Sequence, residues 1–174
     1  MFRIVTLLLC MLSLALAGCS STPEKHPELA DDDKAAVAKI ERLVGSLSVG
    51  TDGEPDLTID EAGHVIEVDL SGNEKLNDAV LEHVGKLTHT QKLFLTSTPV
   101  TDAGLAYLAG LSELKHLELS STAVTNAGLA HLKPLKNLRT VICRNTQINS
   151  AGSNELKKTL PEVLVTQDGK PSVP

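Results

Sequence analysis

The chain has few aromatic residues and no excess of positive charge. Its 174 residues include no tryptophan, one tyrosine and two phenylalanines, and its formal net charge at pH 7 is −6. Proteins that bind nucleic acids neutralise phosphates with clusters of lysine and arginine, and many stack bases on aromatic rings. The lysines and arginines of this sequence form no basic stripe. We therefore expect no nucleic-acid partner.

The sequence also lacks the short motifs that mark common catalytic sites. It contains neither a GxSxG nor an HExxH segment, and residues 85–88 (GKLT) lack the first glycine and the hydroxyl residue of a phosphate-binding loop. Catalysis normally needs a nucleophile or an acid–base pair held in a pocket. We expect a protein that is not an enzyme and needs no cofactor.

The acidic run and the histidines are interpreted without a metal ion. Asp31–Asp33 precede a segment with helical periodicity, so we interpret them as helix caps. His83, Tyr107 and His131 share one register, but on the helical side, where neighbouring helices pack about 8–10 Å apart and zinc bonds are only about 2.1 Å long. The other histidines are assigned to the N-terminal segment, to turns or to a strand: His26, His64, His89 and His116.

The N-terminal segment has the pattern of a signal peptide. Arg3 is followed by an almost wholly apolar run over residues 4–17. This run is shorter than the ~20 residues that cross a bilayer, so it indicates a targeting signal. Polar, proline-bearing residues follow, and we interpret residues 19–33 as a flexible tether.

The segment Leu16-Ala17-Gly18-Cys19 resembles the lipobox of bacterial lipoproteins. The resemblance implies a signal peptide over residues 1–18, cleavage before Cys19 and acylation of Cys19, which would anchor the protein to a membrane of the cell envelope. Ser20 after the cysteine implies the outer membrane where the cell has two. The alternative is ordinary secretory cleavage after Ala17, which leaves Cys19 as a thiol.

An N-terminal cap is predicted over residues 34–64. A helix is expected over Lys34–Leu47, because apolar residues recur at steps of three and four. Residues 57–59 and 65–68 are two short strand-like runs around a turn, which predicts a hairpin. The exposed end of a repetitive stack needs such a cover.

The rest of the chain repeats itself with a period of 24 residues. Each repeat is predicted to begin with a strand and, after a Ser/Thr/Asn-rich loop, to start a short helix at an N-cap residue: Asn77, Thr101, Thr125 and Asn149. Gly104, Gly128 and Gly152 are expected where neighbouring coils pack tightly. Four of the repeating columns are Leu93, Leu117 and Val141; Leu95, Leu119 and Cys143; Thr98, Thr122 and Thr146; and Val100, Val124 and Ile148.

This pattern resembles the short bacterial leucine-rich repeat, most clearly over residues 95–105 (LTSTPVTDAGL). The resemblance implies an α/β solenoid, with short parallel strands on a concave face and short helices on a convex face. It covers most of residues 65–166, the segment assigned to the repeats and a terminal strand. We expect a disordered tail over residues 167–174. Cys143 is interpreted as a core residue; with Cys10 removed with the signal peptide and Cys19 acylated, the mature chain would form no internal disulfide.

The fold implied by this resemblance has its binding surface on the strand face. Strand alternation predicts three outward columns: Glu67, Lys92, His116 and Thr140; Asp69, Phe94, Glu118 and Ile142; and Ser71, Thr96, Ser120 and Arg144. Phe94 would thus lie between Asp69 and Glu118, and exposed aromatics among polar groups often anchor interfaces. The alternative for Phe94 is that its ring is covered by its own protein. The predicted function is recognition of a protein, peptide or glycan by a membrane-tethered module, and the alternative is a structural envelope lipoprotein without a specific ligand. The predicted binding residues are Asp69, Lys92, Phe94, His116, Glu118, Ile142 and Arg144.

Overall fold

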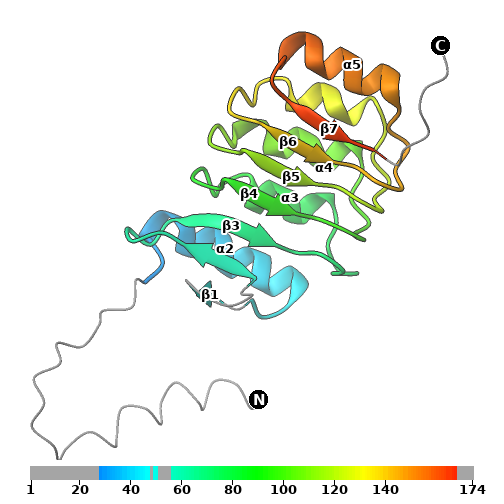
Figure 1. Cartoon of the computed structure of the whole chain (residues 1–174). Helices are drawn as coiled ribbons and strands as arrows, with labels where there is room; N and C mark the ends of the chain where they lie inside the picture. The colour runs from blue at the N-terminus through cyan, green and yellow to red at the C-terminus, as the bar shows by residue number, and fades with distance from the viewer. Residues whose placement is uncertain (1–27, 48, 51–55, 168–174) are drawn as a thin grey trace, which may run out of the picture.

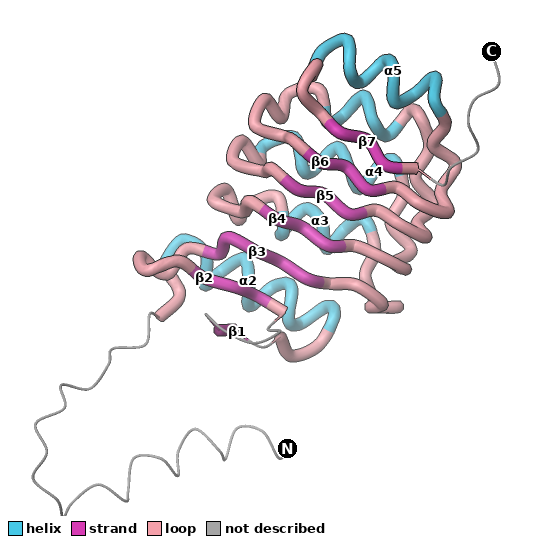
Figure 2. The backbone as a smooth tube through the Cα atoms, viewed as in Figure 1, coloured by secondary structure: helices cyan, strands magenta, loops and turns pink. Residues whose placement is uncertain are grey.

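The computed structural model describes residues 28–47, 49–50 and 56–167. Its strands form one seven-stranded sheet in the order β1-β2-β3-β4-β5-β6-β7, which is also their order along the chain. The strands lie on one side of the stack and the helices on the other, with loops joining them at both ends of each coil (Figures 1 and 2). This arrangement confirms the predicted α/β leucine-rich-repeat solenoid.

The N-terminal helix α2 spans Asp31–Val44, so it begins and ends three residues earlier than predicted. It ends before Gly45, whose φ of 112° lies in the region that favours glycine. Val37, Ile40 and Val44 are buried as the periodicity predicts, whereas Leu43 is 44% exposed. The helix packs against α3 of the first repeat and covers this end of the stack.

The prediction that Asp31–Asp33 cap this helix is wrong. All three residues lie inside its first turn, and Ala30 at the N-cap position makes no side-chain capping bond. Asp33 is buried instead, and its Oδ2 accepts a hydrogen bond of 2.7 Å from the backbone N–H of Val65. The acidic side chains still favour the positive end of the helix dipole, but one of them joins two elements.

A hairpin follows the helix, as predicted. Strand β1 (Val49–Gly50) pairs in parallel with β2 (Leu57–Ile59), and β2 pairs antiparallel with β3 (Val65–Asp69). The turn between β2 and β3 is closed by Asp60, whose Oδ1 accepts hydrogen bonds of 2.9 Å from the N–H groups of Ala62 and His64. The pairing of β1 is not predicted by the sequence pattern.

The repeats add parallel strands at a constant step. These are β4 (Lys92–Phe94), β5 (His116–Glu118), β6 (Thr140–Ile142) and the terminal β7 (Leu164–Thr166). The buried central residues of β3–β6 pair across the sheet in the predicted register: Val68 with Leu93, Leu93 with Leu117, and Leu117 with Val141. The half-buried Val165 of β7 pairs with Val141, which continues the same register by one step that the sequence pattern does not predict.

The helical side is less regular than the strand side. The helices are α3 (Asp78–Val84), α4 (Asp102–Ala106) with the 3₁₀ segment η1 (Tyr107–Gly110), the 3₁₀ segment η2 (Gly128–Leu132), and α5 (Ser150–Thr159). Asn77, Thr101 and Asn149 are N-caps, as predicted, but Thr125 precedes no α-helix. Pro134 follows η2 and lacks the N–H that would extend it into a helix.

Polar side chains connect each coil to the next at the helix starts. Asp78 accepts from both the N–H and the hydroxyl of Thr101, at 2.9 and 2.6 Å, and Asp102 accepts from the same groups of Thr125, at 2.7 and 2.6 Å. In the last step, Asn126 accepts from the N–H of Asn149 at 3.0 Å and donates to its side chain at 2.9 Å. We call these three contacts the rungs.

The regular spacing of the glycines within this sequence is explained by the rungs. A Cβ atom at Gly104, Gly128 or Gly152 would overlap the side chain of Asp78, Asp102 or Asn126, respectively. Each glycine therefore makes room for the rung residue of the preceding coil, which confirms the predicted tight packing.

The loop threonines close the turn after each strand. The hydroxyls of Thr98, Thr122 and Thr146 donate to carbonyl oxygens three residues earlier, at 2.7–2.8 Å. Cys143 is 1% exposed and its thiol contacts the carbonyl oxygen of Thr166 at 3.3 Å, so its interpretation as a core residue is confirmed.

Candidate binding surface on the strand face

The outward side chains of β3–β6 form two complete columns. The sheet register aligns Asp69, Phe94, Glu118 and Ile142 in one column, and Glu67, Lys92, His116 and Thr140 in the other. We call these two columns, together with Arg144 just beyond β6, the strand face. Six of the seven predicted binding residues therefore lie on four adjacent strands, and the seventh follows the last of these strands.

An aromatic pair lies at the centre of this surface. The rings of Phe94 and His116 are tilted by 45° with their centroids 5.2 Å apart. Both residues are half-buried, so Phe94 is partly covered by a side chain of the next strand but is not sealed inside. Rings that pack at this centroid distance attract each other, and the contact restricts both side chains.

Charged groups of both signs surround the pair. Lys92 Nζ forms an ion pair with Glu67 Oε2 at 2.9 Å, and Asp69 Oδ1 accepts from the N–H of Ser71 at 2.9 Å. Asp69, Lys92 and Arg144 are exposed, and Glu118 is half-buried. Surface ion pairs contribute little stability, so these charges are available to a ligand at little cost.

The third predicted outward column is only partly outward. Ser71 is exposed and Thr96 is half-buried, but Ser120 is only 8% exposed. Its Oγ accepts a hydrogen bond of 3.3 Å from the N–H of Arg144. The interpretation of Ser120 as a surface residue is therefore wrong, because this serine joins two neighbouring loops.

These side chains offer a ligand several kinds of contact. Parallel strands hold them about 4.8 Å apart on a rigid surface. The strand face offers one aromatic pair, one aliphatic side chain and charges of both signs, which together suit recognition of a mixed polar and apolar ligand.

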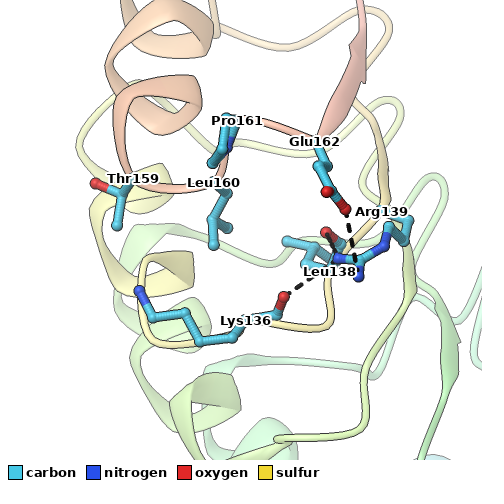
Figure 3. A pocket seen from close by; sticks show the side chains of 7 residues that line it. All are labelled: Lys136, Leu138, Arg139, Thr159, Leu160, Pro161 and Glu162. Carbon is cyan, nitrogen blue, oxygen red and sulfur yellow. Dashed lines mark hydrogen bonds and ion pairs between the residues drawn. The ribbon is translucent and has the colours of Figure 1, made fainter.

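A pocket of about 330 Å³ lies away from the strand face, near the C-terminal end of the stack. Arg139 lies at its side and already contacts the Glu162 carboxylate at 3.5 Å and the carbonyl oxygen of Lys136 at 3.2 Å (Figure 3). The positive charge of Arg139 is therefore partly compensated by the carboxylate of Glu162. The other lining residues are Leu138, Thr159, Leu160 and Pro161.

The histidine register on the helical side forms a surface row. His83 is half-buried, and Tyr107 and His131 are exposed. His83 Nδ1 lies 3.5 Å from Lys86 Nζ. This agrees with the interpretation of these residues as surface packing.

The sequence interpretation missed a second group of histidines. Ligand atoms of Asp32, His64 and His89 lie within 4.8 Å of one another, and the two imidazole centroids are 4.1 Å apart. The sequence contains a pattern that predicts this proximity: His64 and His89 are 25 residues apart, and the same step separates Leu70 from Leu95. The assignment of both histidines to turns concealed that they share a register.

The acidic residues beside this histidine cluster have shifted pKa values. Burial raises the pKa of Asp33, although the hydrogen bond from Val65 opposes the shift. Partial burial acts in the same direction on Asp60, but the N–H groups of His64 and Ala62 outweigh it and lower the Asp60 pKa.

The predicted signal peptide over residues 1–18, Cys19 and the rest of the predicted tether up to residue 27 lie outside the described residues, as do residues 168–174. Two bounds are corrected: residues 31–33, assigned to the tether, belong to α2, and Gln167, assigned to the disordered tail, donates from its Nε2 to the carbonyl oxygen of Asn149 at 3.1 Å. No helix in the described part of the chain is long and apolar enough to cross a membrane.

Solved structures with a similar arrangement come from bacteria and a plant. A leucine-rich-repeat protein of Leptospira interrogans is 16% identical, with a TM-score of 0.46 over 80% of this chain and 34% of that one. Internalin C2 of Listeria monocytogenes is 18% identical, with a TM-score of 0.45 over 76% and 68%. The leucine-rich-repeat ectodomain of the receptor kinase SOBIR1 from Arabidopsis thaliana is 15% identical, with a TM-score of 0.49 over 81% and 93%.

The chain therefore spans about a third of the length of the Leptospira protein. No protein-family model matches the sequence, and a comparison with curated proteins gives no match.

Proposed function

We propose that this protein is a membrane-tethered binding module that recognises a protein partner through its strand face. The observation that carries the proposal is the half-buried pair of Phe94 and His116 at the centre of a rigid sheet, with charges of both signs around it. Interfaces gain most of their binding energy from a few such aromatic anchors, while the surrounding polar groups give specificity.

The anchor is proposed from the sequence. The lipobox-like segment ends at Cys19, and acylation there with more than one chain would hold the protein on its membrane. The described chain enters the stack beside the hairpin turn, where the N–H of Ala30 donates to the carbonyl oxygen of Gly63 at 2.8 Å. We place the protein in the cell envelope, on the outer membrane where there are two.

Site-specific photo-cross-linking in intact cells tests the binding surface. A photoreactive amino acid is placed at Ser71 or Thr140 on the strand side, or at the exposed Ala130 or Asn154 on the helical side. We expect a discrete cross-linked product from the two strand-side positions alone, and mass spectrometry of that product identifies the partner. Equal products from both sides would contradict the proposal.

The aromatic anchor is tested by Phe94→Ala. Loss of an interface hot spot costs about 2 kcal/mol or more, so the affinity for the identified partner should fall at least tenfold. Tyr107→Ala is the matched control, because it removes an exposed aromatic ring from the helical side. If Phe94→Ala and Glu118→Ala both leave the affinity unchanged, or if no partner cross-links, the structural alternative is favoured.

The membrane anchor is tested separately by Cys19→Ser. The wild-type protein should incorporate labelled palmitate and sediment with membranes, and the variant should do neither. A wild-type protein that is secreted without label would support ordinary signal cleavage, and would leave the proposal for the strand face intact.

A further inference from the structure

We infer that Asp32, His64 and His89 form a binding site for a divalent transition-metal ion of the zinc class. One ligand atom from each of these residues lies within 4.8 Å of the other two. Two imidazole nitrogens and a carboxylate oxygen are donors that zinc prefers, with bonds of about 2.0–2.2 Å. Ligand atoms around a tetrahedral zinc lie about 3.4 Å apart by this geometry, so small side-chain rotations would complete the site.

The backbone beside each ligand is held by a chain of buried hydrogen bonds. Asp33 Oδ2 accepts from the N–H of Val65 at 2.7 Å, and the hydroxyl of Thr90 donates to the carbonyl oxygen of the same Val65 at 3.4 Å. These three residues are at most 2% exposed. Each of them directly follows one of the proposed ligands in the sequence. The buried chain therefore holds the three ligands together before any ion binds.

Carboxylates orient both histidine rings. His89 Nδ1 lies 3.1 Å from Glu113 Oε1, and His64 Nδ1 lies 3.6 Å from Asp60 Oδ2. Asp60 is itself fixed by the two backbone N–H groups of its turn. A carboxylate at one ring nitrogen is the usual outer partner of a metal-binding histidine, since it holds the proton there and leaves the other nitrogen's lone pair for the metal.

The charges around the site favour a cation. Asp32, Asp33, Asp60 and Glu113 contribute acidic groups around two imidazoles that are close to each other. The two imidazole centroids are 4.1 Å apart, and a metal ion bound between them would offset the surrounding acidic charge.

Binding would join three separate parts of the chain. Asp32 lies in the first turn of α2, His64 directly precedes β3, and His89 lies in the turn before β4. These elements adjoin one another at the N-terminal end of the stack (Figure 1). A bound ion would therefore fasten the N-terminal cap to the first repeat, at the end where the chain enters the fold.

Isothermal titration calorimetry with zinc chloride tests the inference on the purified full-length chain without a histidine tag. We expect one ion per chain and a rise in Tm by several degrees at saturating zinc, because a ligand that binds only the folded state stabilises it. His64→Ala and His89→Ala should lose this binding. Glu113→Gln should weaken it by about 10–100-fold, as expected for an outer carboxylate.

Two further variants separate the site from general effects. Asp32→Asn changes an exposed side chain, so it should keep the fold, as judged by circular dichroism, and lose most of the affinity. His131→Ala removes an exposed histidine from the helical side and should bind as the wild type does. Zinc binding that persists in both His64→Ala and His89→Ala, or that His131→Ala weakens equally, would overturn the inference.

Discussion

The joints between repeats and the joint at the N-terminal cap are built differently. Between repeats, one strand pairs in parallel with the next and one rung connects the helix starts, with the same register at each step. At the cap, β2 runs antiparallel to β3 with a register shift at Thr58 and Ile59. A buried carboxylate, Asp33, makes the connection to Val65 there.

The difference follows from the direction of the chain. Successive repeats run in the same direction and are related by a translation, so the same contacts recur between each pair of coils. The residues that make these contacts therefore recur in the sequence at a regular spacing. The cap reverses the chain at the turn before β3, so its contacts occur once. Gly63 is one example: its φ is 88°, and a Cβ there would overlap the carbonyl oxygen of Glu28.

The same substitution at both kinds of joint should give different losses. Gly128→Ala places a methyl group against the Asp102 side chain, and we expect overpacking and a displaced rung to lower the free energy of unfolding by about 2–3 kcal/mol. Gly63→Ala should instead release the segment before α2. Urea unfolding measures the first effect, and amide hydrogen exchange should show the second as lost protection in α2 with the repeats unchanged.

Gly110→Ala is the control for both variants. A Cβ at this position would lie 3.8 Å from the carbonyl oxygen of Gly85, an ordinary contact. Stability should be unchanged or rise by up to about 1 kcal/mol. An equal loss in all three variants would show that the glycines matter for backbone freedom and not for the rungs.

The rungs themselves can be compared along the stack. Asp102→Ala removes an ionised acceptor of two hydrogen bonds and leaves the N–H of Thr125 without it, so we expect a loss of about 1–3 kcal/mol. Asn126→Ala removes a neutral rung and should lose about 0.5–1.5 kcal/mol. Both are measured by urea unfolding. A larger loss for Asn126→Ala would mean that the last joint depends on its rung more than the inner joints do.

The smallest effect is expected for Glu155→Gln in α5. Hydrogen bonds and charge from Lys158, and then Lys133 of the preceding coil, lower the pKa of Glu155. A carboxyl with a lowered folded-state pKa stabilises the protein above its unfolded value of about 4.5 and loses that contribution as the pH falls through the folded value. The wild type should therefore exceed the variant slightly in Tm at pH 7 and low salt.

This advantage should disappear as the pH falls through the lowered folded-state pKa of Glu155. It should also disappear in high salt, because the pair is exposed and screened. An advantage that survives both conditions would point to a packing role for Glu155.

The repeated part of the fold could be predicted because its signals recur. The pairing of Leu93 with Leu117 follows from their spacing of 24 residues. Asn77 and Asn149 were predicted as N-caps, and each of them caps the helix that follows it. Thr125 shows the limit of this reasoning. It has the right side chain, and its Oγ1 still accepts from the N–H of Ala127, but only a 3₁₀ segment follows.

The unrepeated part could not be predicted in the same way. Asp33 has the sequence context of a helix cap, and only its tertiary contact with Val65, 32 residues away, gives it a different role. The strand face was placed correctly as a set of columns, because alternation along a strand is a local rule. The burial of Ser120 depends on the neighbouring loop, which the alternation rule does not include.

The uniform step of 24 residues has a consequence for how such a chain can change. Tandem duplication of one unit, for example residues 101–124, would insert a complete strand, its share of the interior and one rung, while both ends kept their present neighbours. Deletion of one unit would be the reverse. Recombination between similar gene segments could therefore lengthen or shorten the molecule by whole coils, and widen its outer surface by about 4.8 Å each time, without the invention of a new contact.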